Sequence, residues 1–316
     1  MATKSRREFL KRSAACAATA SAWTTLGAAE TESKPLDMVI VRANGGQGGP
    51  IEDNEAVDKY ARSMTQEAIK ALGGMGRFVN KGDTVWIKPN IAWDRSPEQA
   101  ANTNPALVAM LVELCLAAGA KKVKVGDNTC NEARKTYPRS GIEAAAKAAG
   151  AEMVYIDESR FKDYDVGGER VRKWPVYPEI VESDLVINCP IVKDHSLTKL
   201  TACMKNYMGV VGGKRGLWHQ NMGTCLTDIT KFMKPRLCVL DATRILTAHG
   251  PTGGSLADVK RLDTVAAGTD IVALDAFAAE LRGVAPADIE SIVAGQAAGL
   301  GTVDYRNLAL KEMDVA

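Results

Sequence analysis

The chain has 316 residues, of which 40 are basic, 38 acidic and 46% hydrophobic, so its formal net charge is only +2. This balance excludes the strongly basic composition typical of nucleic-acid-binding proteins, and it does not favour an anionic membrane surface. The length and the apolar content predict one large domain or two small ones, with ample material for a core.

The first 29 residues resemble a twin-arginine (Tat) secretion leader. Arg6 and Arg7 precede Phe9, Leu10 and Lys11, and an Ala-, Ser- and Thr-rich run then leads to small residues at 27–29. The run is too short and too weakly apolar to remain as a membrane span. We therefore expect a cleaved Tat signal peptide over 1–29, a disordered lead-in over 30–36 and a periplasmic or otherwise exported protein that meets the Tat machinery. The alternative is an N-terminal amphipathic helix of the mature fold.

Removal of this leader would take away five basic residues and one acidic residue, which leaves a net charge of −2. The Tat route carries proteins that fold before export, often with a cofactor, but it does not identify one. Six cysteines remain after cleavage, and no two of them form a CxxC pair. The sequence therefore contains no intrinsic ferredoxin-type iron–sulfur motif.

Short apolar runs alternate with helical patterns along the rest of the chain. Strands are expected at Met38–Arg42, Thr84–Lys88, Lys122–Gly126, Glu152–Ile156, Asp184–Asn188, Leu237–Leu240 and Thr264–Ala267. Helices are expected at Glu55–Leu72, Pro105–Ala118, Gly141–Ala148, Thr224–Phe232, Ile271–Leu281 and Pro286–Ala298. This alternation predicts a single α/β domain over 37–316, with a mainly parallel open sheet, helices on both faces and Rossmann-like layering. A TIM barrel is the competing arrangement, but seven uneven units fit an open sheet better.

Polar residues follow several of the expected strands. Lys88 and Asn90 end one strand, Asp127 follows another, and Asp241 follows a third. Ligands of open parallel sheets bind beyond the carboxyl ends of the strands, so these side chains predict a shared cleft. Turns also favour Asp, Asn and Gly in their own right, and therefore no single case is decisive.

The segment from Asn188 to Asn221 concentrates lysines, Arg215 and two of the three histidines. Three interpretations fit it: a site for a phosphate or carboxylate, acid–base catalysis, or a solvated basic loop. For catalysis, the candidates are Lys193, His195 and Lys205, with His195 titrating near neutrality as a proton shuttle. If the stretch from Thr198 to Met208 is helical, Thr201 and Lys205 share one of its faces.

The remaining candidates are ligand-binding residues from the strand ends and from the glycine-containing turns. They are Lys88, Asn90, Asp127, Asn206, Lys214, His219, Asp241 and Gly253. The three histidines have no HxxH or HExxH spacing, so a divalent metal is possible but only weakly indicated, and its ligands are unknown.

Several of these residues fall in motifs that resemble the domain-of-unknown-function family 362. The motifs are Lys88-Pro89-Asn90, Asn188-Cys189-Pro190-x-x-Lys193-x-His195, Lys205-Asn206-x-x-Gly209, Gly250-Pro251-Thr252-Gly253-Gly254 and Thr269-Asp270-x-x-Ala273-x-Asp275-Ala276. The resemblance covers roughly 37–285 and supports the motif lysines, Asn90, His195, Asn206 and Gly253 as site candidates, but it implies no settled activity. Some relatives carry an attached ferredoxin module, which this sequence lacks.

Two functions remain open from the sequence. One is an enzyme that acts on a small anionic molecule, in which Lys88, Lys205 and Lys214 position the anion and His195 or Lys193 moves a proton. The other is a non-catalytic extracytoplasmic carrier, or a protein that assembles a redox complex. The two need the same lysines, but only an enzyme needs a proton donor with a shifted pKa.

Overall fold

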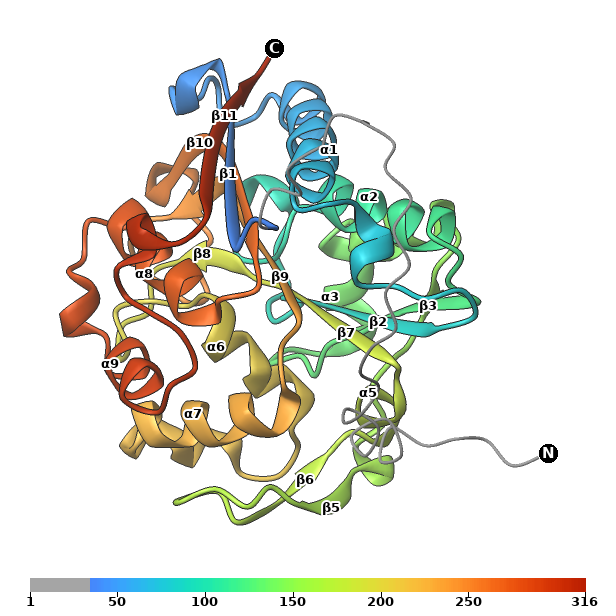
Figure 1. Ribbon diagram of the computed structural model, residues 1–316, viewed down its shortest axis with the longest axis vertical. Coiled ribbons are helices and arrows are strands. Elements are labelled where there is room, and N and C mark those ends of the chain that lie inside the picture. Colours follow the sequence, from blue (N-terminus) through green and yellow to red (C-terminus); the bar gives the residue numbers. More distant parts are fainter. Residues whose placement is uncertain (1–34) are drawn as a thin grey trace, which may run out of the picture. The chain divides into compact units, whose positions relative to one another are not determined.

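A mixed, mostly parallel nine-stranded sheet runs through residues 35–316, which are the residues that the computed structural model describes (Figure 1). These residues form one compact unit. The strand order is β11-β1-β10-β9-β7-β2-β3-β4, with β8 paired to β9 at the side. Only β10 runs antiparallel to its neighbours. The predicted α/β class with a mainly parallel open sheet is therefore confirmed. The expected signal peptide lies outside the described residues, as does the lead-in up to residue 34.

The strands are β1 Met38–Ala43, β2 Thr84–Pro89, β3 Lys122–Val125, β4 Glu152–Met153, β5 Lys162–Asp165, β6 Lys173–Val176, β7 Leu185–Cys189, β8 Ile191–Lys193, β9 Leu237–Leu246, β10 Val259–Gly268 and β11 Leu310–Val315. The α-helices are α1 Asn54–Ala71, α2 Pro105–Ala117, α3 Ala133–Arg139, α4 Ile142–Ala148, α5 Pro178–Glu182, α6 Cys203–Asn206, α7 Met222–Met233, α8 Ile271–Leu281 and α9 Glu290–Ala297. The β5–β6 hairpin forms a separate two-stranded sheet.

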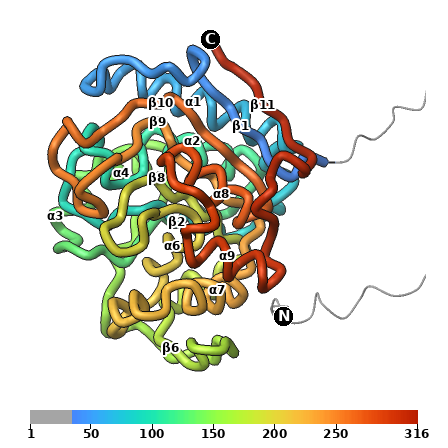
Figure 2. The backbone as a smooth tube through the Cα atoms, turned by 90° about the vertical axis from the view of Figure 1, so that its left-hand side faces the viewer, coloured from blue at the N-terminus to red at the C-terminus, as the bar shows by residue number. Residues whose placement is uncertain are grey.

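Alternate residues of the large sheet pack into two separate apolar clusters. Val39 and Val41 of β1 point into the cluster that α1, α2 and α4 cover, whereas Met38 and Ile40 point into the cluster that α6 to α9 cover. The side chains of a strand alternate between faces, so a strand buried on both sides has an almost continuous apolar sequence. Figure 2 shows α1 and α2 on one side of the strands and α7 and α9 on the other.

The strands that the sequence did not reveal are short or lie at the edge of a sheet. Edge strand β11 carries three charged residues among its six, and β8 has only three residues. Conversely, β9 extends six residues beyond the predicted end at Leu240, so Asp241 lies within the strand rather than after it.

The helix considered for the stretch from Thr198 to Met208 is much shorter in the structure. Thr201 instead forms a β-bridge with Lys193, and the α-helical part is α6 alone. The buried carboxylate of Asp275, on α8, accepts hydrogen bonds from the backbone N–H groups of Cys203 (2.5 Å) and Met204 (3.1 Å). Burial raises the pKa of Asp275 to about 7. This carboxylate fixes the start of the helix that carries Lys205 and Asn206.

No helix within residues 35–316 is long and apolar enough to cross a lipid bilayer.

Candidate functional site

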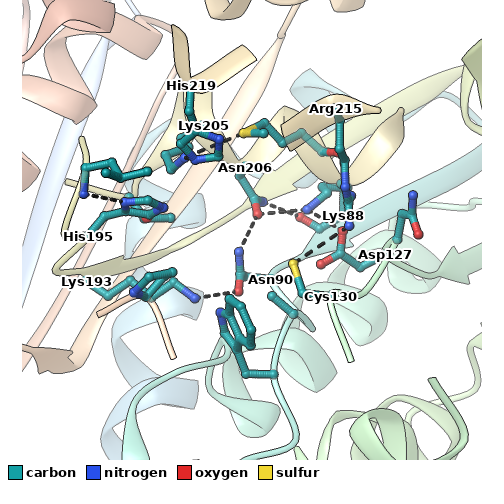
Figure 3. A pocket seen from close by; sticks show the side chains of 18 of the residues that line it. Lys88, Asn90, Asp127, Cys130, Lys193, His195, Lys205, Asn206, Arg215 and His219 are labelled. Carbon is teal, nitrogen blue, oxygen red and sulfur yellow. Dashed lines mark hydrogen bonds and ion pairs between the residues drawn. The ribbon is translucent and has the colours of Figure 1, made fainter. Parts of the chain in front are cut away.

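Five segments that are distant in sequence border one cavity of about 350 Å³ beyond the carboxyl ends of β2, β3 and β7 (Figure 3). They are the loops after β2, β3 and β8, the stretch from α6 to a 3₁₀ helix at Arg215–Gln220, and the loop after β9, which contributes Pro251. The cavity brings together eight of the residues that the sequence proposed: Lys88, Asn90, Asp127, Lys193, His195, Lys205, Asn206 and His219.

A buried ion pair forms the floor of this cavity. The Lys88 Nζ lies 2.7 Å from the Asp127 Oδ1, and both side chains are almost fully buried. The same Nζ donates hydrogen bonds to the Pro89 carbonyl and the Asn206 Oδ1, each at 2.8 Å, so its three N–H bonds all have acceptors. Burial lowers the pKa of Lys88, and the Asp127 carboxylate partly offsets this effect. All N–H bonds of the Lys88 ammonium group are therefore used within the protein, and none is left for a ligand.

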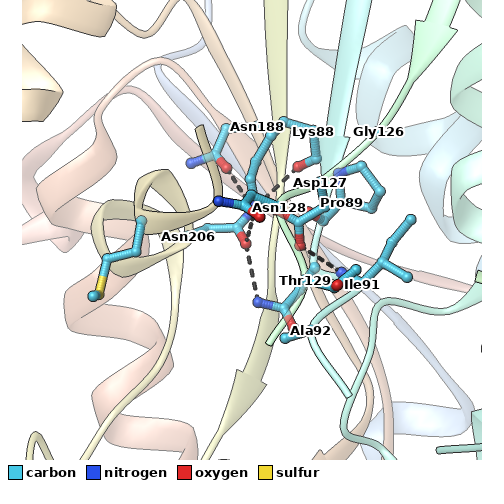
Figure 4. Close-up of polar contacts among 12 residues, drawn as sticks. Lys88, Pro89, Ile91, Ala92, Gly126, Asp127, Asn128, Thr129, Asn188 and Asn206 are labelled. Atoms are coloured by element: carbon cyan, nitrogen blue, oxygen red, sulfur yellow. Dashed lines mark hydrogen bonds and ion pairs between the residues drawn. The ribbon is translucent and has the colours of Figure 1, made fainter. Parts of the chain in front are cut away.

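Asn206 joins the ends of two neighbouring strands (Figure 4). Its Oδ1 accepts hydrogen bonds from Lys88 and from the Asn90 Nδ2 (3.1 Å), and its Nδ2 donates to the Asn188 Oδ1 (2.8 Å). Lys88 and Asn188 are direct neighbours in the pairing of β2 with β7. A Cβ at Gly209 would collide with both members of the Lys88–Asp127 pair, so the spacing Lys205-Asn206-x-x-Gly209 has a steric reason.

Lys193 is the buried lysine that retains a donor. Its Nζ donates to the Asn90 Oδ1 (3.0 Å) and to the Ala101 carbonyl (2.7 Å). Within residues 35–316 the third N–H has no acceptor, and the side chain lines the cavity. Burial lowers the pKa of Lys193 to about 7, so its ammonium group can lose its proton near neutral pH.

Lys205 forms a second cationic point at the cavity wall. Its Nζ lies 3.1 Å from the His219 Nε2 and 3.5 Å from the Met208 Sδ. The His219 Nδ1 lies 2.9 Å from the Gly216 carbonyl, so we assign the ring proton to Nδ1 and make Nε2 an acceptor from Lys205. Burial lowers the pKa of Lys205 to about 7.

His195 differs from the expectation that it titrates near neutrality. Its Nδ1 accepts hydrogen bonds from the backbone N–H groups of Leu197 (3.2 Å) and Thr198 (3.4 Å), so Nε2 carries the proton of the neutral ring. Burial, followed by the positive charge of Lys205, lowers the pKa of His195 to about 3. The ring stacks on His219 with a centroid distance of 5.2 Å. His195 is therefore a neutral hydrogen-bond donor, and the lining residues whose pKa burial brings to about 7 are Lys193 and Lys205.

The other three proposed residues do not line the cavity. Asp241 is fully buried within β9, where its carboxylate accepts hydrogen bonds from the Asn104 N–H (2.7 Å) and from Thr243. It therefore supports the start of α2, where Asn104 is the N-cap. Lys214 is exposed, and Gly253 packs against Leu246 in a turn.

Other lining residues were not proposed as site residues from the sequence, among them Arg215, Cys130, Thr201 and Trp93. Arg215 donates hydrogen bonds to the Met208 carbonyl (2.7 Å) and the Thr129 carbonyl (2.9 Å), so it ties two walls of the cavity together. Lys214 and Arg215 have the same charge and are adjacent in sequence. Only the start of the 3₁₀ helix, which no sequence pattern marks, decides which of the two faces inward.

Among the residues that the structure describes, no three His, Cys, Asp or Glu side chains come together in a group able to hold a metal ion.

Replacement of Lys88 by Met is expected to lower the free energy of unfolding by about 3–5 kcal/mol, because the Asp127 carboxylate would remain buried without a counter-ion. Chemical denaturation measures this loss. The matched control is Lys173→Met, which breaks an exposed ion pair with Asp163 and should cost less than about 1 kcal/mol. Equal stability of the two variants would contradict the structural role of Lys88.

Two solved structures show limited likeness to this fold. The lactate racemase apoprotein from Thermoanaerobacterium thermosaccharolyticum aligns at 11% identity and a TM-score of 0.43, over 78% of this chain and 57% of that chain. A protein from Thermotoga maritima aligns at 10% identity and a TM-score of 0.38, over 75% and 60%. The chain thus spans less than two thirds of either structure, and this likeness carries no argument about activity.

Sequence comparison identifies the family. The thylakoid-associated protein sll1697 of Synechocystis sp. is 29% identical over 240 residues, which are 73% of each chain. The family model described as a domain of unknown function, DUF362, matches residues 85–280, and this range contains all five segments of the cavity. The chain therefore belongs to the DUF362 family.

Proposed function

We propose that the cavity binds a small ligand that carries a carboxylate or phosphate group. The observation that carries this proposal is the surplus of positive charge. Asp127 is the one acidic residue among the described lining residues, and Lys88 already neutralises it. Lys193, Lys205 and Arg215 have no carboxylate of their own in the cavity. An anion would supply the missing charge and the missing hydrogen-bond acceptors.

The rest of the lining limits the size of this ligand. A volume of about 350 Å³ is at the lower end of ligand pockets, which begin at about 300 Å³. Trp93, Leu197 and Met208 contribute apolar surface beside the cationic groups. A short carbon skeleton with one anionic group matches both properties.

Replacement of Lys193 or Lys205 by Met is expected to weaken anion binding at least about tenfold, because each loses a charge-assisted hydrogen bond of roughly 1.5–3 kcal/mol. Isothermal titration calorimetry with phosphate, oxalate and malonate measures the change. The matched control is Lys214→Met, which removes the same charge from an exposed neighbouring position and should keep the affinity within about twofold.

The proposal fails if no anion of this series binds the wild-type chain. It also fails if Lys214→Met weakens binding as much as the two cavity variants, because binding would then depend on net charge alone.

Acid–base catalysis on the bound anion is the second candidate function. The observation that favours it is that burial lowers the pKa of Lys193 and of Lys205 to about 7, so either amine can lose its proton at neutral pH. The simpler alternative is a non-catalytic extracytoplasmic binding or assembly protein, which uses the same anion site without turnover.

The pH dependence separates binding from catalysis. A bound anion stabilises both ammonium groups and raises their pKa values. Affinity should therefore be fully present below about pH 7 and should fall above it, by up to about tenfold per pH unit for each lysine. A lysine that acts as a base would show the opposite pH profile. The rate at which the α-protons of a bound carboxylate exchange with deuterated solvent should then rise through pH 7, and NMR measures this rate.

Lys205→Arg provides the control, because an arginine stays protonated and should flatten the fall in affinity. An affinity that does not change between pH 6 and 9 would exclude lysines that titrate in this range from the binding site.

We also propose that the protein is exported in folded form through the Tat pathway, on the strength of the paired arginines at the start of the sequence. Replacement of Arg6 and Arg7 by lysines should retain the chain in the cytoplasm as an uncleaved precursor. Fractionation with immunoblotting measures this outcome, and Lys4→Arg is the control that leaves the pair intact. Unchanged export of the double variant would contradict this part of the proposal.

A further inference from the structure

Cys130 differs from the other cysteines of the described chain. Residues 35–316 contain six free cysteines, of which five are buried and Cys130 is exposed. Cys130 also lines the cavity that the lysines border. The exposed Cys130 side chain thus lies on the wall of a candidate ligand site.

The backbone and a guanidinium group fix the position of this thiol. The Cys130 N–H donates a hydrogen bond to the Ala92 carbonyl (2.9 Å), and the preceding carbonyl, of Thr129, accepts one from the Arg215 Nη2 (2.9 Å). The same Nη2 lies 3.8 Å from the Cys130 Sγ, as Figure 3 shows. The peptide group between Thr129 and Cys130 is therefore held at both its carbonyl and its N–H, and a permanent positive charge lies beside the sulfur.

A second observation points to a ligand in the same cavity. Thr201 lines it and is only 4% exposed, and its hydroxyl has no hydrogen-bond partner in the part of the chain that the structure describes. A buried hydroxyl without a partner costs about 1–3 kcal/mol unless a ligand or water satisfies it. This feature is independent of the cysteine.

Building on the proposed function, we propose that Cys130 forms a covalent bond to an electrophilic carbon of the anionic ligand. The sulfur–carbon bond forms while the bond from that carbon to its leaving group breaks. The leaving group departs with the electron pair, and the thiol releases its proton to the medium. Lys193, Lys205 and Arg215 attract the anion, so the reacting carbon is concentrated beside the sulfur. The substrate class is thus an anion with a displaceable group close to its charge.

Iodoacetate and iodoacetamide test this inference, because they differ mainly in charge and deliver similar carbon electrophiles. Both rates are measured at Cys130 of the full chain by peptide mass spectrometry, at low ionic strength. The iodoacetate-to-iodoacetamide rate ratio should exceed that of the denatured chain by about tenfold or more, within the range known for electrostatic focusing. Added salt and phosphate should both lower this ratio.

Three variants complete the test. Cys130→Ser should abolish labelling within residues 35–316 of the native chain, because the other cysteines of this range are buried. Lys205→Met should lower the ratio, whereas Lys214→Met, which removes the same charge from an exposed position outside the cavity, should leave both the ratio and the iodoacetamide rate within about twofold.

The inference is overturned if the iodoacetate-to-iodoacetamide rate ratio of the native chain equals that of the denatured chain, while the Cys130→Ser variant still binds phosphate or malonate by calorimetry. This outcome leaves the proposed function standing. A wild-type chain that binds none of the anions overturns the proposed function, and with it the ligand assigned here to Cys130.

Discussion

The buried ion pair between Lys88 and Asp127 is the interaction on which the rest of the cavity depends. It lies where the ends of β2 and β3 meet, and Asn206 links it to Asn188 at the end of β7. Two charges of opposite sign cost much less free energy in a dry interior than either charge alone, so neither residue can be lost without the other. The pair also accounts for Gly209, because any side chain there would displace it.

This arrangement divides the lysines into two kinds. Lys88 uses every donor on the protein itself and gives the site its shape. Lys193 and Lys205 keep donors that face the cavity, and burial brings their pKa values to about 7. Lys88 is thus a rigid group at the base of the cavity, and Lys193 and Lys205 are titratable groups at its wall. A bound anion would change the protonation state of these two lysines without reshaping the fold.

The sequence predicted most of the fold and the identity of the cavity-lining lysines, because both depend on local patterns. Apolar runs marked the long buried strands, and the polar residues after them marked the edge where the site lies. Asp241 was misplaced because a polar residue in an apolar run suggests a strand end, whereas hydrogen bonds from Asn104 and Thr243 allow its burial within β9. Such compensation depends on tertiary contacts that a sequence pattern does not contain. Arg215 and Cys130 were missed for the same reason, since only the folded loops show that they meet.

The cavity is built from segments between Lys88 and Pro251 that approach one another only in the folded chain. Ligand affinity and global stability are therefore thermodynamically linked. A ligand that binds the folded chain alone stabilises it by RT ln(1 + [L]/Kd), which is about 2.7 kcal/mol at one hundred times the dissociation constant. The unfolded chain has no part of the site in place, and so the proposed ligand would bind and stabilise the folded chain alone.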